Sequence, residues 1–318
     1  MTALVPIQPQ PIGNLAPAAE QAREYARRAR AASTLRAYKL DWESFTAWCS
    51  ENGLCALPAK PETVASYLAA QARGHKASTI QRRLSAISMV HQVRGFESPC
   101  RNELVRSVIK GIRRTLGTAP NEKAPLLASD VREMTAMLPD SLLGRRDRAM
   151  LLLGFAGAFR RSEICSLNVE DLAFTEDGLI VTLRRSKTDQ EGHGRKIGVP
   201  LLPTSDACPV RAVREWLAAS GITEGPLFRS VSSGRLHAER LSDQTVAKVV
   251  KRRLPAGRDT SRFAGHSLRA GFVTSAASGG ASLKAITNQT GHRSLTVVLR
   301  YMRDSSLFRN NAVASTGL

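Results

Sequence analysis

The sequence predicts a mainly α-helical fold of two domains, with a small antiparallel β-sheet in the second domain. Apolar residues recur at three- and four-residue steps over most of the chain, which is the spacing of one helix face. A stretch near residue 120 contains two prolines and no periodicity, so it divides the chain. Two short runs rich in β-branched residues follow each other in the second half. The 318 residues are enough for two separate hydrophobic cores.

These patterns divide the chain into four segments. Residues 1–18 hold four prolines and are expected to form a flexible arm. A helical domain is predicted over 19–116, a linker over 117–125, and an α-rich second domain over 126–318.

Four helices are predicted in the first domain. The first has an apolar face formed by Leu35, Tyr38, Trp42, Phe45 and Cys49. Pro61 suits the first turn of a second helix, which is expected to end near Ala70. A third helix is expected over 78–94 and a fourth over 103–114.

The third predicted helix has two kinds of face. Its mainly apolar stripe is formed by Ile80, Leu84 and Ile87, together with either Val90 or His91. Its other faces carry basic and hydroxyl side chains, namely Thr79, Arg82 and Arg83, with Lys76 just before the start. Such a surface suits contacts to phosphates in a nucleic-acid groove. An ordinary solvated face has the same composition, so both interpretations stand.

The second domain is predicted to combine helices with one β-hairpin. Asp130 opens a helical run, and the apolar segment 150–157 is expected to be a buried helix. The β-rich runs 179–183 and 197–201 are predicted to pair across the long polar loop between them. Further helices are expected at 209–220, 242–253, 266–278, 282–290 and 296–303.

The charge of the chain indicates a polyanionic partner. There are 46 Lys and Arg against 27 Asp and Glu, a formal net charge of +19. An excess of this size favours nucleic acid, and a basic surface without a partner is the alternative. Residues 1–115 carry 17 Lys and Arg against 8 Asp and Glu, so the excess is not confined to one tail. We therefore expect both domains to contact the same polyanion.

The cysteines predict a reducing compartment, and the hydropathy pattern predicts a protein without a membrane span. Cys49, Cys55, Cys100, Cys165 and Cys208 show neither a CxxC pair nor a Cys/His metal spacing. We expect free thiols in the cytosol and no bound metal. The first residues lack a secretory pattern, and no stretch approaches the roughly 20 apolar residues of a membrane span. A soluble, cytoplasmic protein without membrane contact is expected.

An ordered set of residues in the second domain suits phosphodiester chemistry. In chain order these are Arg160, Lys187, His266, Arg269, His292 and Tyr301. A phenol can attack the phosphorus, arginines bind its charged oxygens through two parallel N–H groups, and a lysine can protonate the departing alkoxide. Glu163 follows Arg160 by three residues on the same helical face and can fix the direction of its guanidinium. Protein cations offset the developing charge, so no metal or other cofactor is needed.

In type, order and spacing these residues resemble the active site of the tyrosine recombinase (phage integrase) family. The motifs that carry the resemblance are Gly157-Ala-Phe-Arg-Arg-Ser-Glu163, Ser186-Lys-Thr-Asp189, His266-Ser-Leu-Arg269, and Gly291-His292 followed by Tyr301. The likeness covers about 33–307. It implies that the first domain is the helical core-binding (SAM-like) domain of the family and the second its catalytic domain. Thr290 stands where the family more often has leucine, which we expect to alter packing rather than chemistry.

The resemblance also implies a role for each residue. Tyr301 is then the nucleophile that forms a 3′-phosphotyrosyl link, Lys187 protonates the 5′ oxygen, and His266 manages the tyrosine proton. The two arginines and His292 hold the phosphoryl oxygens. Lys196, across the same loop, and Arg184 or Arg185 compete with Lys187, which is preferred because Ser-Lys-Thr-Asp matches the family loop.

The implied activity is site-specific DNA recombination of the simple Cre/Xer-like type, independent of metal and ATP. Family likeness implies a homotetramer on two double-stranded DNA sites of inverted-repeat type, with strand exchange through a Holliday junction. Segment 305–318 is expected to dock on a neighbouring subunit. A type IB topoisomerase-like or telomere-resolving enzyme is the alternative within enzymes. A catalytically silent DNA-binding regulator is the alternative outside them.

The helix predicted at 242–253 resembles the family helix that enters the major groove. Ser242 is expected to cap it. The residues expected to face DNA are Gln244, Lys248, Lys251 and Arg252. Gln can pair with adenine and Lys with guanine, but we favour mostly phosphate contacts.

Overall fold

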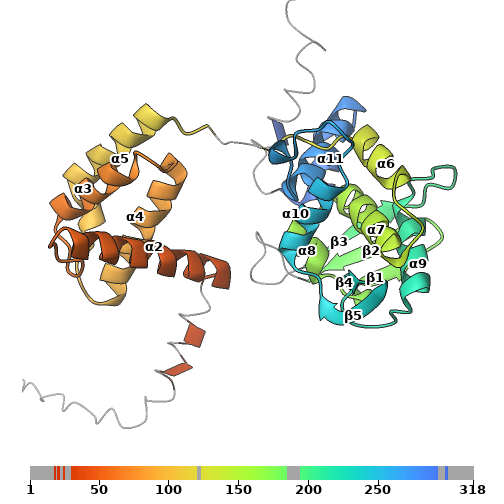
Figure 1. The fold of residues 1–318 in the computed structure, drawn as a ribbon, viewed down its shortest axis with the longest axis horizontal. Helices are drawn as coiled ribbons and strands as arrows, with labels where there is room; N and C mark the ends of the chain where they lie inside the picture. The colour runs from red at the N-terminus through yellow and green to blue at the C-terminus, as the bar shows by residue number, and fades with distance from the viewer. Residues whose placement is uncertain are drawn as a thin grey trace, which may run out of the picture. The chain divides into compact units, whose positions relative to one another are not determined.

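The computed structural model divides the chain into two compact units, Met1–Asn121 and Glu122–Leu318 (Figure 1). It describes residues 18, 20, 21, 24, 25, 30–119, 123–184, 194–292, 298 and 299. Helices predominate in both units, and the strands described belong to the second, so the predicted fold class is confirmed. Most of the predicted arm and of the predicted helix 296–303 lies outside the described residues. Among the described residues, no helix is both long and apolar enough to cross a membrane.

The first unit holds the four predicted helices, and the second, third and fourth lie within a few residues of their expected ends. They are α2 (Ala32–Glu51), α3 (Pro61–Gln71), α4 (Ala77–Val93) and α5 (Glu103–Leu116), with a short 3₁₀ turn η1 (Pro99–Arg101) before α5. Pro61 occupies the first turn of α3, where its missing N–H is not needed. The Asn102 side chain caps α5 by accepting a hydrogen bond from the Leu104 N–H. Phe45, Tyr67 and Leu68 are fully buried at the centre of the core.

His91, not Val90, completes the apolar stripe of α4. Its ring is fully buried, whereas Val90 is half-buried. The Ala59 N–H donates to His91 Nε2 (2.9 Å), so Nδ1 carries the proton and donates to the Ile87 carbonyl (2.8 Å). Both ring nitrogens are thereby satisfied, which is what a buried histidine requires.

The second unit begins before the predicted start of its domain. The Ala124 N–H donates to the Arg262 carbonyl (2.8 Å), and the Leu126 N–H donates to the Ser267 carbonyl (2.9 Å). The end of the predicted linker therefore runs along the second unit as an extended segment.

The helices of the second unit are α6 (Ala128–Ala136), α7 (Leu142–Ala156), α8 (Arg161–Ser166), α9 (Pro209–Ser220), α10 (Asp243–Arg252), α11 (His266–Ser278) and α12 (Leu283–Thr290), with 3₁₀ turns η2 (Val169–Asp171) and η3 (Thr260–Arg262). Helix α7 packs against α6, α9 and α11, which makes it central to the unit (Figure 1). Met150, Leu151 and Leu153 of α7 are fully buried, as predicted for the apolar run 150–157.

The predicted hairpin is present as strands β2 (Gly178–Leu183) and β3 (Arg195–Pro200), which pair antiparallel with Val181 opposite Ile197. Residues 185–193 of its loop lie outside the described residues. Strand β1 (Leu172–Phe174) extends this sheet in the order β1-β2-β3. A second sheet, β4 (Arg229–Ser232) with β5 (Arg235–Arg240), was not predicted. Most of β5 is exposed and polar, so the alternation that marks a half-buried strand is missing.

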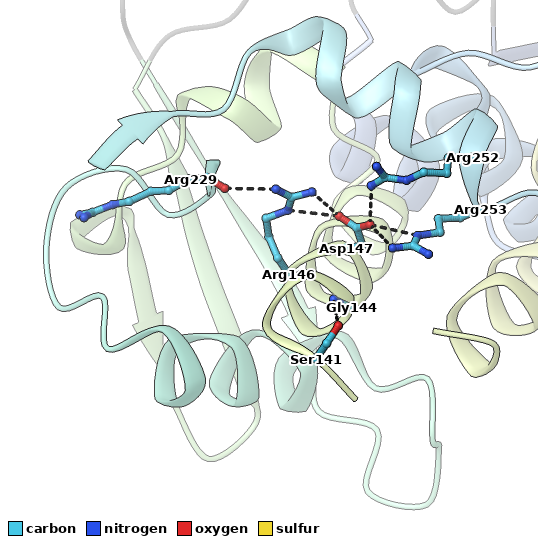
Figure 2. Close-up of polar contacts among 7 residues, drawn as sticks. All are labelled: Ser141, Gly144, Arg146, Asp147, Arg229, Arg252 and Arg253. Carbon is cyan, nitrogen blue, oxygen red and sulfur yellow. Dashed lines mark hydrogen bonds and ion pairs between the residues drawn. The ribbon is translucent and has the colours of Figure 1, made fainter. Parts of the chain in front are cut away.

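A buried carboxylate fixes the end of α10 to α7. Asp147 is fully buried and lies among three guanidinium groups (Figure 2). Arg146 donates to its Oδ1 from Nε (3.1 Å) and Nη2 (2.6 Å). Arg252 (3.0 Å) and Arg253 (3.0 and 2.9 Å) donate to its Oδ2. The last turn of α10 is thus attached to the first half of α7 by charge-assisted hydrogen bonds.

Candidate active site

The loop after α7 sets the position of the first arginine. Ala158 has a positive φ of 49°, which is uncommon for a residue with a side chain. The fully buried Phe159 ring lies against Gly157, where an added Cβ would stand 2.2 Å from a ring carbon. A residue larger than glycine would therefore displace the Phe159 ring. This sharp turn brings Arg160 to the position just before α8.

Glu163 holds Arg160 by two contacts. Its Oε1 accepts from Arg160 Nη1 (2.5 Å), and its Oε2 accepts from the Arg160 backbone N–H (2.8 Å). Glu163 is 2% exposed and the Arg160 side chain 13% exposed, so the pair is shielded from water. The expected contact is present, but the expected geometry was wrong. Arg160 precedes the helix, and Glu163 acts as the returning side chain of a helix cap.

The second arginine supports the same loop. Arg269 lies one turn into α11, is 6% exposed, and donates from Nη1 to the Ala158 carbonyl (2.7 Å). Helix α11 is thereby joined to the segment that carries Arg160. His266 is the first residue of α11 and is exposed.

Arg195 was missed from the sequence and joins strand β3 to the end of α12. Its guanidinium donates to the carbonyls of Asn288 (3.3 Å), Gln289 (3.0 Å) and Thr290 (3.2 Å). Cations at a helix C-terminus satisfy the last carbonyls and oppose the helix dipole. Gly291 ends α12 with φ 64°, and an added Cβ there would lie 2.9 Å from the Arg195 guanidinium. Because these contacts span about ninety positions, no local spacing predicts them.

His292 lies where these elements meet. Its Nδ1 is 2.8 Å from the hydroxyl of Thr290, a fully buried residue, so Thr290 does more than the expected packing. Burial, and then the positive charges of Arg269, Arg160, Arg195 and His266 in that order of effect, together lower the pKa of His292 to about 4. The ring is therefore neutral near pH 7 in the protein without DNA.

We call the group formed by Arg160, Arg195, His266, Arg269 and His292 the basic site. Burial, and then the charge of Arg160, lower the pKa of Arg195, while Glu163 opposes the shift. Fixed cations that are already desolvated stabilise negative charge well, because little reorganisation is needed when the charge appears. The described residues hold no cluster of three or more His, Cys, Asp or Glu side chains placed for a metal ion.

Two predicted catalytic residues, Lys187 and Tyr301, lie outside the described residues, as does Arg185. Two of the residues that compete with Lys187 for its role are described. Lys196 is exposed on β3, whereas Arg184 donates from Nε to Asp171 (2.6 Å). This ion pair uses Nε of Arg184, and the Arg184 side chain remains 64% exposed.

The basic helix α4 uses two of its arginines inside the first unit. Arg82 donates to both oxygens of Asp41 (2.7 and 2.9 Å). The Arg83 side chain is 12% exposed, and its Nη1 donates to the Tyr67 hydroxyl (3.1 Å) and to Gln71. These contacts stabilise the packing of α4 on α2 and α3.

The remaining candidates of the first unit are more accessible. Lys76 is exposed just before α4, and Thr79 is half-buried in its first turn. DNA contact by these two residues and by the two arginines of α4 stays a prediction.

Helix α10 is fixed at both ends. The exposed ion pair between Arg161 and Asp243 (3.1 Å) joins its start to α8, and Arg252 joins its end to Asp147. Ser242 stands at the cap position, as expected, but its hydroxyl pairs with the Thr245 hydroxyl (2.9 Å) and caps no backbone N–H. The predicted DNA-facing residues Gln244, Lys248 and Lys251 are exposed, and Arg252 is half-exposed.

Comparison with known proteins shows the family of the chain. The model of the phage integrase family matches residues 125–306, and that of the phage integrase N-terminal SAM-like domain matches 24–94. The integrase/recombinase xerD homolog of Selenomonas ruminantium is 40% identical over 299 residues, which cover 92% of this chain and 88% of that protein. The recombinase cre of Escherichia phage P1 is 27% identical and covers 82% of this chain and 81% of its own.

Solved structures share the fold. A lambda integrase fragment solved as a dimer on a COC′ core site matches with a TM-score of 0.60 at 18% identity, covering 90% of this chain and 94% of that one. The XerH recombinase on a palindromic difH substrate matches with a TM-score of 0.56 at 15% identity, covering 80% and 71%. The chain belongs to the phage integrase family, the tyrosine recombinases, which are DNA breaking and rejoining enzymes.

Proposed function

We propose that this chain is a site-specific DNA recombinase that cuts and rejoins duplex DNA through Tyr301. The observation that carries the proposal is the basic site, in which Arg269 supports the loop before Arg160 and both arginines lie close enough to His292 to lower its pKa. A phosphodiester carries one negative charge shared by its two nonbridging oxygens, and these three side chains offer the donors that such a group needs. The name of the cre relative and the DNA substrates in the XerH and lambda integrase structures support duplex DNA as the partner.

The proposed cleavage step is a substitution at phosphorus. The Tyr301 oxygen forms a bond to the scissile phosphorus, and the bond from phosphorus to the 5′ oxygen breaks. His266 takes the phenol proton, and Lys187 gives a proton to the leaving 5′ oxygen, so a 5′-hydroxyl is released. The arginines of the basic site bind the nonbridging oxygens as charge builds on them.

Rejoining reverses these steps. The 5′-hydroxyl of a partner strand attacks the 3′-phosphotyrosine, and Tyr301 leaves as a phenol. The covalent link keeps the energy of the broken bond, so the reaction needs neither ATP nor a metal.

Strand exchange also requires that several subunits meet on two DNA sites. We propose that four subunits assemble there and exchange strands through a Holliday junction. A largely apolar pocket of about 570 Å³ supports assembly between copies. It is formed by side chains of α6, α7, α11 and α12, among them Val131, Phe155, Phe272 and Ile286. Segment 305–318, which lies outside the described residues, carries Leu307 and Phe308 as apolar side chains that such a pocket accepts.

The first experiment tests the covalent step. A DNA duplex nicked beside the scissile phosphate traps the cut strand on the protein, and peptide mass spectrometry identifies the modified residue. The wild-type protein is expected to give an adduct on Tyr301, and Tyr301→Phe is expected to bind the same DNA without forming one. A strand attached to another side chain contradicts the proposal.

A second experiment separates the enzyme classes. Two-site DNA is incubated with the protein, and products are compared with relaxation of a supercoiled plasmid that has no site. Recombinant products from a complex whose mass corresponds to four chains support the recombinase. Relaxation alone indicates a topoisomerase-like enzyme, and DNA binding without any adduct indicates a regulator.

A further inference from the structure

The hydroxyl of Thr290 has one proton and several neighbours. Its Oγ1 lies 2.8 Å from the Ile286 carbonyl, 3.4 Å from the Thr287 carbonyl and 2.8 Å from His292 Nδ1. A carbonyl oxygen only accepts, so the single hydroxyl proton belongs to the Ile286 carbonyl. If that proton were directed at His292 instead, two oxygen acceptors would face each other at 2.8 Å without a proton between them.

The position of the single hydroxyl proton determines which nitrogen of His292 carries the ring proton. With the hydroxyl proton used on the helix, Oγ1 can only accept from Nδ1, so Nδ1 must be the protonated nitrogen. The Nε2 nitrogen of the neutral ring is then without a proton.

The backbone around this contact is held in place. Arg195 binds the Thr290 carbonyl (3.2 Å) and lies against Gly291, whose φ of 64° ends the helix. Thr290 is fully buried, so its hydroxyl cannot exchange its partners for water. The ring of His292 is therefore oriented by a hydroxyl whose own position is fixed.

We infer that Thr290 is a positioning residue that keeps the proton of His292 on Nδ1, so that Nε2 can donate to a scissile phosphate only after the ring takes up a second proton. The inference rests on the proposed function, because it assigns the phosphate of that reaction to Nε2. The groups that face the ring are Arg160 before α8, Arg195 on β3, and His266 and Arg269 on α11, with Glu163 bound to Arg160.

The charges of the site agree with this order of events. The surrounding cations oppose a proton on the free ring, and the pKa of about 4 keeps it neutral near pH 7. A bound phosphate brings negative charge next to Nε2 and favours the imidazolium. DNA binding and proton uptake are thus coupled at His292.

The first test reads the tautomer directly and uses no DNA. The full chain is labelled with ¹⁵N-histidine, and the His292 signals are identified by their loss in His292→Gln. Wild type and Thr290→Ser are expected to show a proton on Nδ1, whereas Thr290→Val, which keeps the shape and removes the hydroxyl, is expected to shift toward the Nε2–H form. A wild-type ring with its proton on Nε2, or an unchanged tautomer in Thr290→Val, overturns the inference.

The second test measures single-turnover adduct formation on the nicked duplex as a function of pH. Wild type and Thr290→Ser are expected to slow as pH rises, because the bound imidazolium loses its proton. Thr290→Val is expected to be about 10-fold slower near neutral pH, by analogy with the loss of other orienting partners, and to have a flatter profile. Equal losses in Thr290→Ser and Thr290→Val, or parallel profiles, contradict the inference.

The two tests fail separately. If wild type forms no adduct, the proposed function fails, and the ¹⁵N spectrum still decides whether Thr290 sets the tautomer. If Thr290→Val does not fold, Thr290→Ala removes the same hydroxyl and is read by the same two measurements.

Discussion

At the scale of single residues, the basic site depends on side chains that hold other side chains. Glu163 fixes Arg160, Arg269 supports the turn at Ala158, and Thr290 orients His292. Outer partners of this kind are needed because a donor must already point at the place where charge develops. Loss of a supporting residue is therefore expected to slow cleavage while DNA binding is retained.

His292 makes folding stability depend on pH. Its pKa is about 4 in the folded protein and about 6.5 in the unfolded chain, so between these values the unfolded chain binds more protons. Stability contributed by this residue is therefore lost as pH falls from 6.5 toward 4. Over this pH window the free energy of unfolding of His292→Gln is expected to fall by about 1 kcal/mol less than that of wild type. This figure allows for solvent screening of a partly exposed ring.

Urea unfolding at pH 7.5 and pH 5 measures this difference. His237→Gln is the matched control, because His237 is an exposed histidine on β5 far from the basic site along the chain. It is expected to keep the wild-type pH dependence. If wild type and His292→Gln lose the same stability between pH 7.5 and pH 5, the effect does not come from His292.

The sequence predicted the members of the basic site that stand in local motifs. Arg160, His292 and the His266–Arg269 pair, with Glu163 as a supporting residue, were predicted because they stand in short motifs whose spacing has chemical meaning. Arg195 could not be found in this way, since its carbonyl partners lie at the other end of the domain sequence. The hydrogen bond between Thr290 and His292 was not predicted for another reason. Whether the threonine hydroxyl reaches the histidine ring depends on the backbone geometry at the end of the helix.

At the scale of secondary structure, α10 illustrates two kinds of ion pair. Its first end is held by Arg161 and Asp243, whose side chains are 48% and 42% exposed. Its other end is held by Asp147, which is completely buried among arginines. Exposed pairs contribute little to stability, whereas removal of one partner from a buried set leaves charge without compensation.

Asp147→Asn is therefore expected to lower the free energy of unfolding by about 3–5 kcal/mol, because Arg146 stays buried without its anion. Asp243→Asn is the matched control on the same helix and is expected to cost about 0–1 kcal/mol. Guanidinium chloride unfolding compares the two variants. Similar losses would show that burial does not decide the contribution of these pairs.

Helices were predicted better than strands for a physical reason. The helices α9 and α11 were predicted, and their observed ends agree with those expected. The β4–β5 hairpin has an exposed, charged second strand, so its sequence lacks the alternation of a half-buried strand. Its turn at Ser233 and Gly234 has positive φ at both residues, which is a backbone property that composition alone does not reveal.

At the scale of the whole molecule, the net charge of +19 governs the encounter with DNA. Each phosphate that the protein neutralises releases counterions, so affinity falls steeply with salt. The excess is present in both units, which agrees with contacts along an extended stretch of duplex. Exposed lysines without a buried carboxylate partner are the side chains that contribute most to this term.

Lys248→Ala is expected to weaken binding to all duplexes by a similar factor and to reduce the slope of log affinity against log salt by about 1. Arg145→Ala is the matched control, because the Arg145 guanidinium is already bound to Asp140 (2.6 Å). This substitution is expected to leave the slope unchanged. Fluorescence anisotropy titrations over a range of salt concentrations measure both. A loss confined to one DNA sequence would instead assign Lys248 to base recognition.

The contact of Arg195 with α12 makes two distant parts of the catalytic unit mechanically dependent. A slip of β3 along β2 by one residue, about 3.3 Å, would draw the guanidinium away from three carbonyls at once and leave Gly291 without support. A displacement of the β2–β3 hairpin is therefore expected to shift the imidazole of His292. A partner that binds this strand without touching the reacting phosphate is therefore expected to alter the position of His292.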